Sequence, residues 1–264
     1  MESRLVVPEG AGSLHRSHCP YCLSSVHLDD ESGGQAAGRA AVPAGAAEPF
    51  GTGRGAEMIR LEQKQDWRAV ENLTREAFWN VYRPGCVEHL VLHRLREDAC
   101  FVPELDYVLE EDGEILAHIA YAKGVLSLDG GGQTEMLLFG PVSVLPERQG
   151  RGYGSKIIRD TLERAAEMGF PAVAITGAPE YYSRFGFESA SKYGIYHAML
   201  GHGVDAPFFM VKVLDPDRMA GLRGLYADPA CYEVSEEEVE AFDRAFPPKK
   251  KEVRPGQLTA PQDE

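Results

Sequence analysis

Three glycines fall close together in "PERQGRGYGSKIIRD", which runs from Pro146 to Asp160 and continues into a helical pattern. Gly150, Gly152 and Gly154 let backbone N–H groups turn toward a ligand without a Cβ in the way. The helix that follows adds N–H groups without intrahelical partners and the positive end of its dipole. This arrangement is typical of a site for an anion, most naturally a phosphate.

The spacing of these glycines narrows the choice of ligand. It does not fit the G-x-G-x-x-G of dinucleotide folds, and Lys156 does not complete the G-x-x-x-x-G-K-[ST] of ATP-binding loops. The spacing that fits is Gln149-x-x-Gly152-x-Gly154, which follows the strand-like "GPVSVLPE". Here the sequence resembles the GNAT acetyltransferase superfamily, whose acyl-CoA signature is [RQ]-x-x-G-x-[GA] between a strand and a long helix.

A second stretch carries the same resemblance. In "YYSRFGF", Tyr182, Gly186 and Phe187 fit the family segment Y-x-x-x-G-F. The resemblance covers roughly residues 58–215, and "PEYYSRFGF" with "FFMVKVLDP" is similar to the YhbS-like branch of predicted acetyltransferases.

The resemblance implies an N-acetyltransferase with acetyl-CoA as cosubstrate, which moves the acetyl group directly to a primary amine in a ternary complex. It implies that backbone amides of the loop hold the pyrophosphate, and that a strand segment pairs with the pantetheine arm. The residues so assigned are Val142, Ser143, Val144, Gln149, Gly150, Arg151, Gly152, Tyr153, Gly154 and Ser155. In the family, two parallel strands splay to admit that arm, and Gly140-Pro141 is where we expect strand irregularity.

Tyr182 matches the position of the family's usual general acid. A phenol with a pKa of about 10 is protonated at neutral pH and can donate to a thiolate. The alternative is that Tyr182 only packs against the cosubstrate. The candidate base on the strand before the loop is Glu135, three residues upstream of the aligned family position. His118, His197, Glu104 and a water chain are the alternatives.

A rival interpretation keeps the glycine loop but needs neither acid nor base: a catalytically silent GNAT domain that acts as an acyl-CoA-binding sensor or scaffold. The acceptor, a small-molecule or protein amine, is not specified by the sequence. The formal net charge of −14 favours a cationic acceptor and disfavours nucleic acid, which is bound by neutralising phosphates with Lys and Arg. A homodimer is compatible with this reading.

The elements that must position these residues follow from periodicity. We expect a strand from Met58, a helix capped by Asp66, a helix over 87–97, a hairpin at Asp112-Gly113, and a strand through "TEMLLFGPVSV". A helix over 152–168 and the strand "PAVAITG" complete a βαβ unit, so the flanking strands should be parallel. The fold class is α/β (α+β): a mixed sheet, antiparallel in its first half, with a splayed parallel pair and flanking helices.

Three zones divide the chain. Residues 1–57 lack a sustained period and read as a mostly disordered arm, 58–214 as the GNAT domain, and 215–264 as an extension with a helix at 235–246. In the arm, Cys19 and Cys22 form half of a zinc motif. Zinc binding, dithiol redox chemistry and incidental sequence stay open there. With no membrane-length apolar run, we expect a cytoplasmic protein that does not engage membranes.

Overall fold

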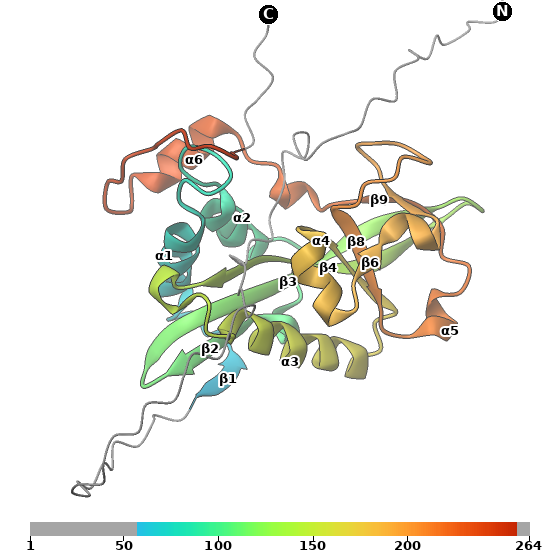
Figure 1. Cartoon of the computed structure of the whole chain (residues 1–264), viewed down its shortest axis with the longest axis horizontal. Coiled ribbons are helices and arrows are strands. Elements are labelled where there is room, and N and C mark those ends of the chain that lie inside the picture. Colours follow the sequence, from blue (N-terminus) through green and yellow to red (C-terminus); the bar gives the residue numbers. More distant parts are fainter. Residues whose placement is uncertain (1–56, 258–264) are drawn as a thin grey trace, which may run out of the picture.

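A computed structural model describes residues 57–257 (Figure 1). Within this range the strands are β1 (Met58–Leu61), β2 (Tyr107–Glu111), β3 (Glu114–Leu128), β4 (Gln133–Val144), β5 (Ala172–Thr176), β6 (Glu188–Ser189), β7 (Ile195–His197), β8 (Phe209–Val213) and β9 (Gly224–Ala227). The helices are α1 (Trp67–Phe78), α2 (Glu88–Leu95), α3 (Tyr153–Glu167), α4 (Pro179–Tyr182), α5 (Pro216–Met219) and α6 (Glu236–Asp243), with several short 3-10 turns.

The strands form one mixed sheet in the order β1-β2-β3-β4-β5-β8-β6. β1 to β4 are antiparallel, and β4 pairs with β5 in parallel, as a βαβ unit through α3 requires. This confirms the expected fold class. The parallel pair β7 and β9, with β9 also antiparallel to β3, was not expected.

The hairpin between β2 and β3 follows from its turn residues. Asp112 and Gly113 have φ of 54° and 81°. An Asp-Gly pair adopts two successive positive φ values at low cost, and that turn matches the twist of the flanking strands. The expected hairpin is therefore confirmed.

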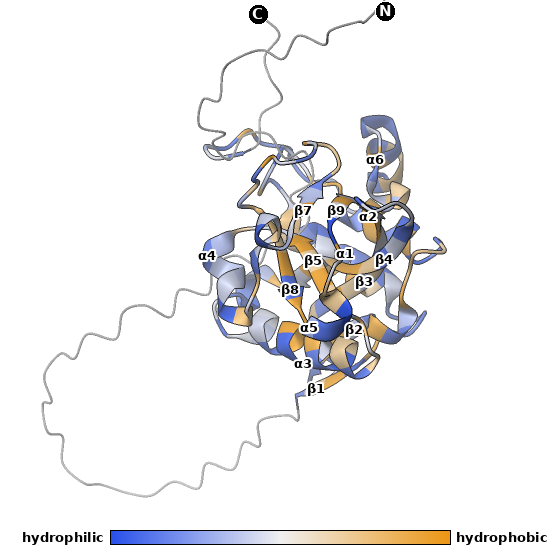
Figure 2. Cartoon of the chain, turned by 90° about the vertical axis from the view of Figure 1, so that its right-hand side faces the viewer, coloured by the Kyte–Doolittle hydropathy of each residue, from blue (hydrophilic) through white to orange (hydrophobic). Residues whose placement is uncertain are grey.

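Helices cover both faces of the sheet. Figure 1 shows α3 on one face and α1 and α2 on the other. Successive β4 side chains alternate between two cores: Leu137 and Phe139 pack with α3, while Met136 and Leu138 pack with α1 and α2. Apolar residues accordingly concentrate on the inner strands in Figure 2, with polar residues outside.

Helix α1 begins where the sequence predicts, but Asp66 does not cap it with its side chain. Its carboxylate instead accepts from the Arg60 guanidinium at 2.6 Å and from the Gln63 N–H at 2.9 Å. Arg60 holds the pKa of this carboxyl below its usual value. The residue therefore ties β1 to the start of α1 rather than closing the helix end.

The segment after residue 214 joins the domain through β9 and α6, among other contacts. β9 pairs with β3 from Val125 to Leu128. Helix α6 begins with the expected capping box, in which Ser235 and Glu238 bond to each other's backbone N–H. Its Asp243 accepts from Arg75 of α1, whose side chain is fully buried. Within the described range, none of the helices has the length and apolar character to cross a bilayer.

Candidate active site

Strands β4 and β5 separate in the middle of the sheet. They pair only at Leu137 with Val173 and at Leu138 with Ala174, after which β4 continues to Val144. The backbone edge of β4 that faces β5 is thus free of ladder partners beyond Leu138 among the residues described. An extended ligand chain can add hydrogen bonds along such an edge.

The opposite edge of β4 is irregular at the expected place. The register with β3 shifts between Ile119, opposite Val142, and Tyr121, opposite Phe139. Gly140 and Pro141, joined by a cis peptide, therefore face the single residue between Ile119 and Tyr121. This bulge sits where β4 leaves β5.

The glycine loop leads from β4 into α3. Gly150 and Gly152 have φ of 73° and 84°, and Gly152 is the N-cap of the helix without a side-chain cap. A Cβ at either glycine would meet no atom within 4 Å. The loop therefore leaves open space beside the N–H groups of the first helical turn, which have no intrahelical acceptors. The Gln149 amide steadies the loop by donating to the Val144 carbonyl at 3.2 Å.

Side chains of this region divide into those that support the fold and those that face outward. Tyr153 is buried and donates to Glu111 at 3.1 Å, and Ser143 donates to Thr74 of α1 at 3.0 Å. These two residues can therefore offer a ligand only their backbone. Arg148 pairs with Glu114 and Lys156 with Glu57, whereas Arg151 is exposed and makes no ion pair within residues 57–257.

Tyr182 lies at the point where the strands separate. It ends α4, and its ring packs against Phe139 of β4 and Phe187, with centroids 6.0 and 5.9 Å apart. Only 1% of its surface is exposed. The neighbouring Tyr181 reaches Ser155 of α3 at 3.5 Å. The structure thus brings the β4 bulge, the start of α3 and the Y-x-x-x-G-F segment together.

Glu135 lies away from this point. It is exposed near the start of β4 and pairs with Lys123 of β3 at 3.0 Å. Phe139, which contacts Tyr182, is four residues further along, about 13 Å at the usual rise of a strand. A direct proton transfer between an amine at the bulge and Glu135 does not fit this distance, so its assignment as base stays a prediction that requires intervening water.

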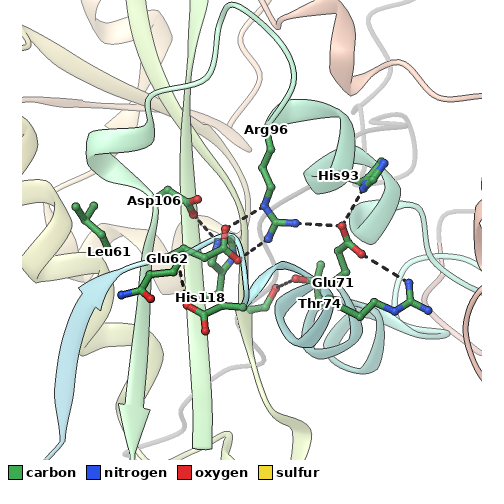
Figure 3. Close-up of polar contacts among 12 residues, drawn as sticks. Leu61, Glu62, Glu71, Thr74, His93, Arg96, Asp106 and His118 are labelled. Carbon is green, nitrogen blue, oxygen red and sulfur yellow. Dashed lines mark hydrogen bonds and ion pairs between the residues drawn. The ribbon is translucent and has the colours of Figure 1, made fainter. Parts of the chain in front are cut away.

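A buried polar network lies on the α1 and α2 face (Figure 3). The Arg96 guanidinium donates to both oxygens of Glu62, at 2.5 and 3.0 Å, and to Glu71 at 3.1 Å. Glu71 also contacts His93 at 2.9 Å. These contacts join β1, α1 and α2, which positions the two helices over the sheet.

His118, an alternative base, belongs to the same network. Its Nε2 lies 2.7 Å from Asp106, and it is fully buried, so burial lowers its pKa to about 4. Burial raises the pKa of Asp106 to about 6 and of Glu62 to about 8. The ligand atoms of these three residues lie close enough to hold a metal ion. The Arg96 guanidinium already donates to both Glu62 oxygens, whereas the buried Nδ1 of His118 has no hydrogen-bond partner within residues 57–257.

A second group with metal-ligand atoms comprises Asp98, Cys100 and Cys231. The two sulfurs are 3.6 Å apart. Contact with Cys231 and burial raise the pKa of Cys100, which favours the thiol over the thiolate that metals bind. Cys19 and Cys22, the zinc candidates of the sequence, lie outside the described residues.

The sequence did not predict one side-chain contact to the bulge at Gly140 and Pro141. The Tyr232 hydroxyl donates to the Gly140 carbonyl at 2.6 Å. Tyr232 also lines a cavity of about 80 Å³ that His197, another of the alternative bases, shares with Asp228 and Glu233. The only sequence signal was a tyrosine after the turn-forming Asp228-Pro229, which does not reveal a partner 92 residues earlier.

Comparisons with known proteins agree with this geometry. Residues 58–190, half of the chain, match the family model described as an acetyltransferase (GNAT) domain, and residues 2–54 match an RNHCP domain. The uncharacterised N-acetyltransferase YhbS of Escherichia coli K12 is 26% identical over 168 residues, which cover 64% of this chain and 93% of that protein.

Two solved structures share the fold. YhbS from Escherichia coli in complex with CoA superposes with a TM-score of 0.58 at 24% identity, over 71% of this chain and 96% of that one. A GNAT family acetyltransferase from Brucella melitensis in complex with acetyl-CoA gives 0.54 at 29% identity, over 68% and 99%. The separated strands, the glycine loop and the family match all fall within residues 58–190. The chain therefore belongs to the GNAT acetyltransferase family.

Proposed function

We propose that the protein transfers an acetyl group from acetyl-CoA to a primary amine by direct attack in a ternary complex. The observation that carries this is the separation of β4 from β5 immediately before the glycine loop. The complexes of YhbS with CoA and of the Brucella protein with acetyl-CoA support the choice of cosubstrate.

Each part of the site has a role in this reaction. Backbone N–H groups of Gln149 to Ser155 bind the pyrophosphate, since α3 presents its N-terminus there without a side-chain cap. Val142 to Val144 bind the pantetheine arm along the free edge of β4. The thioester then lies near the bulge, where backbone N–H groups can stabilise the oxyanion.

Tyr182 completes the reaction as general acid. The neutral amine attacks the thioester carbon, the C–N bond forms and the C–S bond breaks. The phenol of Tyr182 gives its proton to the leaving thiolate, and the proton lost by the amine passes to water. In this scheme Glu135 can accept the proton of the amine only through intervening water molecules.

The test compares Tyr182→Phe with Tyr181→Phe, because both rings are buried in the same aromatic cluster. Free thiol release is measured with acetyl-CoA and a panel of amines, and CoA affinity by calorimetry. We expect Tyr182→Phe to lower kcat by about 10²-fold or more with unchanged CoA affinity, and Tyr181→Phe to retain most turnover. Equal turnover in the two variants contradicts the role of Tyr182.

The same assay decides between enzyme and sensor. A wild-type protein that binds CoA but releases no thiol with any amine fits the scaffold alternative instead.

A further inference from the structure

The cavity beside Tyr232 borders the place where transfer is proposed. It lies between β7, the end of β9 and the 3-10 turn Ala230–Tyr232, and has a volume of about 80 Å³. A single water needs only about 10–15 Å³ of such space, so the end of an alkylamine fits. The Tyr232 side chain is its wall toward β4, because its hydroxyl reaches the Gly140 carbonyl.

Two acidic residues line the cavity: the half-buried Asp228 and the exposed Glu233. His197 donates from Nε2 to Asp228 at 3.1 Å, while its Nδ1 accepts from the Met199 N–H at 3.4 Å. Those two contacts fix the ring of His197 and, through it, the direction of the Asp228 carboxylate.

Arg94, which contacts the backbone of Glu233, does not neutralise these carboxylates. The Arg94 guanidinium donates to the backbone carbonyl of Glu233 at 3.0 Å, and its charge is paired with Glu238 of α6. Neither Asp228 nor Glu233 forms an ion pair with a Lys or Arg within residues 57–257. A ligand with a positive group at this position would therefore gain a charge-assisted hydrogen bond.

The anionic group and the transfer point lie on opposite sides of one tyrosine side chain. A reacting amine must be neutral and must lie at the thioester, near Gly140, whereas the carboxylates favour an ammonium group on the far side of Tyr232. One nitrogen cannot satisfy both positions, but a molecule with two nitrogens separated by a short chain can.

We infer that this cavity anchors the distal ammonium of a small aliphatic diamine, with Asp228 as its principal contact and His197 as the residue that positions Asp228. This rests on the proposed function and names its substrate class. The second amino group is acetylated at the bulge, which it reaches when the Tyr232 ring, 2% exposed here, turns away from Gly140. Monoamines lack the anchored group and are poorer acceptors.

The first experiment measures binding without turnover. The protein–CoA complex is titrated with 1,4-diaminobutane and with butylamine by calorimetry, for the wild type, Asp228→Asn and Glu233→Gln. We expect the wild type to bind the diamine at least tenfold more tightly than the monoamine, and Asp228→Asn to lose most of that difference. Glu163→Gln, on the exposed side of α3, is the charge-matched control and should keep the difference.

Turnover then separates this inference from the proposed function. With acetyl-CoA, the ratio of kcat/KM for the diamine to that for the monoamine should fall about tenfold in Asp228→Asn. If the wild type binds both amines equally, or Asp228→Asn and Glu163→Gln behave alike, the inference is wrong whatever the activity. If the diamine binds through Asp228 and no thiol is released, the binding site stands and the acetyl transfer is wrong. CoA binding of each variant shows that it is folded.

Discussion

The phenol ring of Tyr226 on β9 lies directly against the backbone of Gly124 on β3. A Cβ added to Gly124 would overlap the hydroxyl oxygen and ring of Tyr226, which is itself 1% exposed and stacked on Phe209. β3 therefore accepts the segment after residue 214 only because position 124 has no side chain.

Gly124→Ala should destabilise the fold by about 1–3 kcal/mol, because a buried ring cannot move away without cost. Urea unfolding provides the measurement. Gly130→Ala is the control, since a Cβ there meets nothing within 4 Å. Similar free energies of unfolding for the two variants would show that Tyr226 has room to shift.

Gly152→Ala should weaken CoA binding at least tenfold. The substitution strains a backbone with φ of 84° and places a methyl group in the open space beside the first turn of α3. Gly131→Ala carries the same strain, at φ of 89°, in the turn between β3 and β4, where a Cβ is also unobstructed. Calorimetry with CoA distinguishes them: an equal loss of affinity in both variants would mean that strain alone is responsible.

Asp243→Ala should destabilise the protein by about 3–5 kcal/mol, because it leaves the fully buried guanidinium of Arg75 without its carboxylate. Thermal and urea unfolding measure the effect. Breaking the exposed pair between Arg83 and Glu236 by Glu236→Gln should cost below about 1 kcal/mol. A small loss in Asp243→Ala would indicate that α6 contributes little to holding α1.

Stability should fall in acid through His89. The imidazole is fully buried against Arg75 and Asp243, and burial lowers its pKa from 6.5 to about 4. Between these values the unfolded chain binds a proton that the folded chain does not. This residue therefore removes up to about 1.4 kcal/mol of stability per pH unit as pH falls from 6.5 toward 4.

His89→Gln should lack this contribution, so its stability should change less between pH 6.5 and 4.5 than that of the wild type. Urea unfolding across that range, with the exposed His202→Gln as control, measures the slopes. Parallel slopes for wild type and His89→Gln would contradict a neutral buried His89.

Local sequence signals predicted most of the fold because they act over short distances. The Asp112-Gly113 turn, the periodicity of α1 and α3 and the capping box of Ser235 each depend on neighbours within one element. The same holds for the glycine loop, whose conformation depends on the positive φ of Gly150 and Gly152.

Contacts between residues far apart in the chain could not be predicted from the sequence. β9 is four residues long, and its place depends on space left at Gly124. Asp66 looked like a cap, yet Arg60 takes its carboxylate. Glu135 lies on β4, as expected, but near its start and far from the bulge, where it pairs with Lys123. A sequence shows the order of residues along a strand but not which residues of other strands contact them.

The Tyr232 contact to Gly140 joins a part of the chain inside the range matched by the family model to a part outside it. The glycine loop lies within that range, while Asp228, Tyr232 and Glu233 lie beyond its end at residue 190. Under the inferred diamine site, substitutions in this later segment change which amine is bound and leave the glycine loop untouched. That inference therefore expects acceptor preference and CoA binding to vary independently of each other.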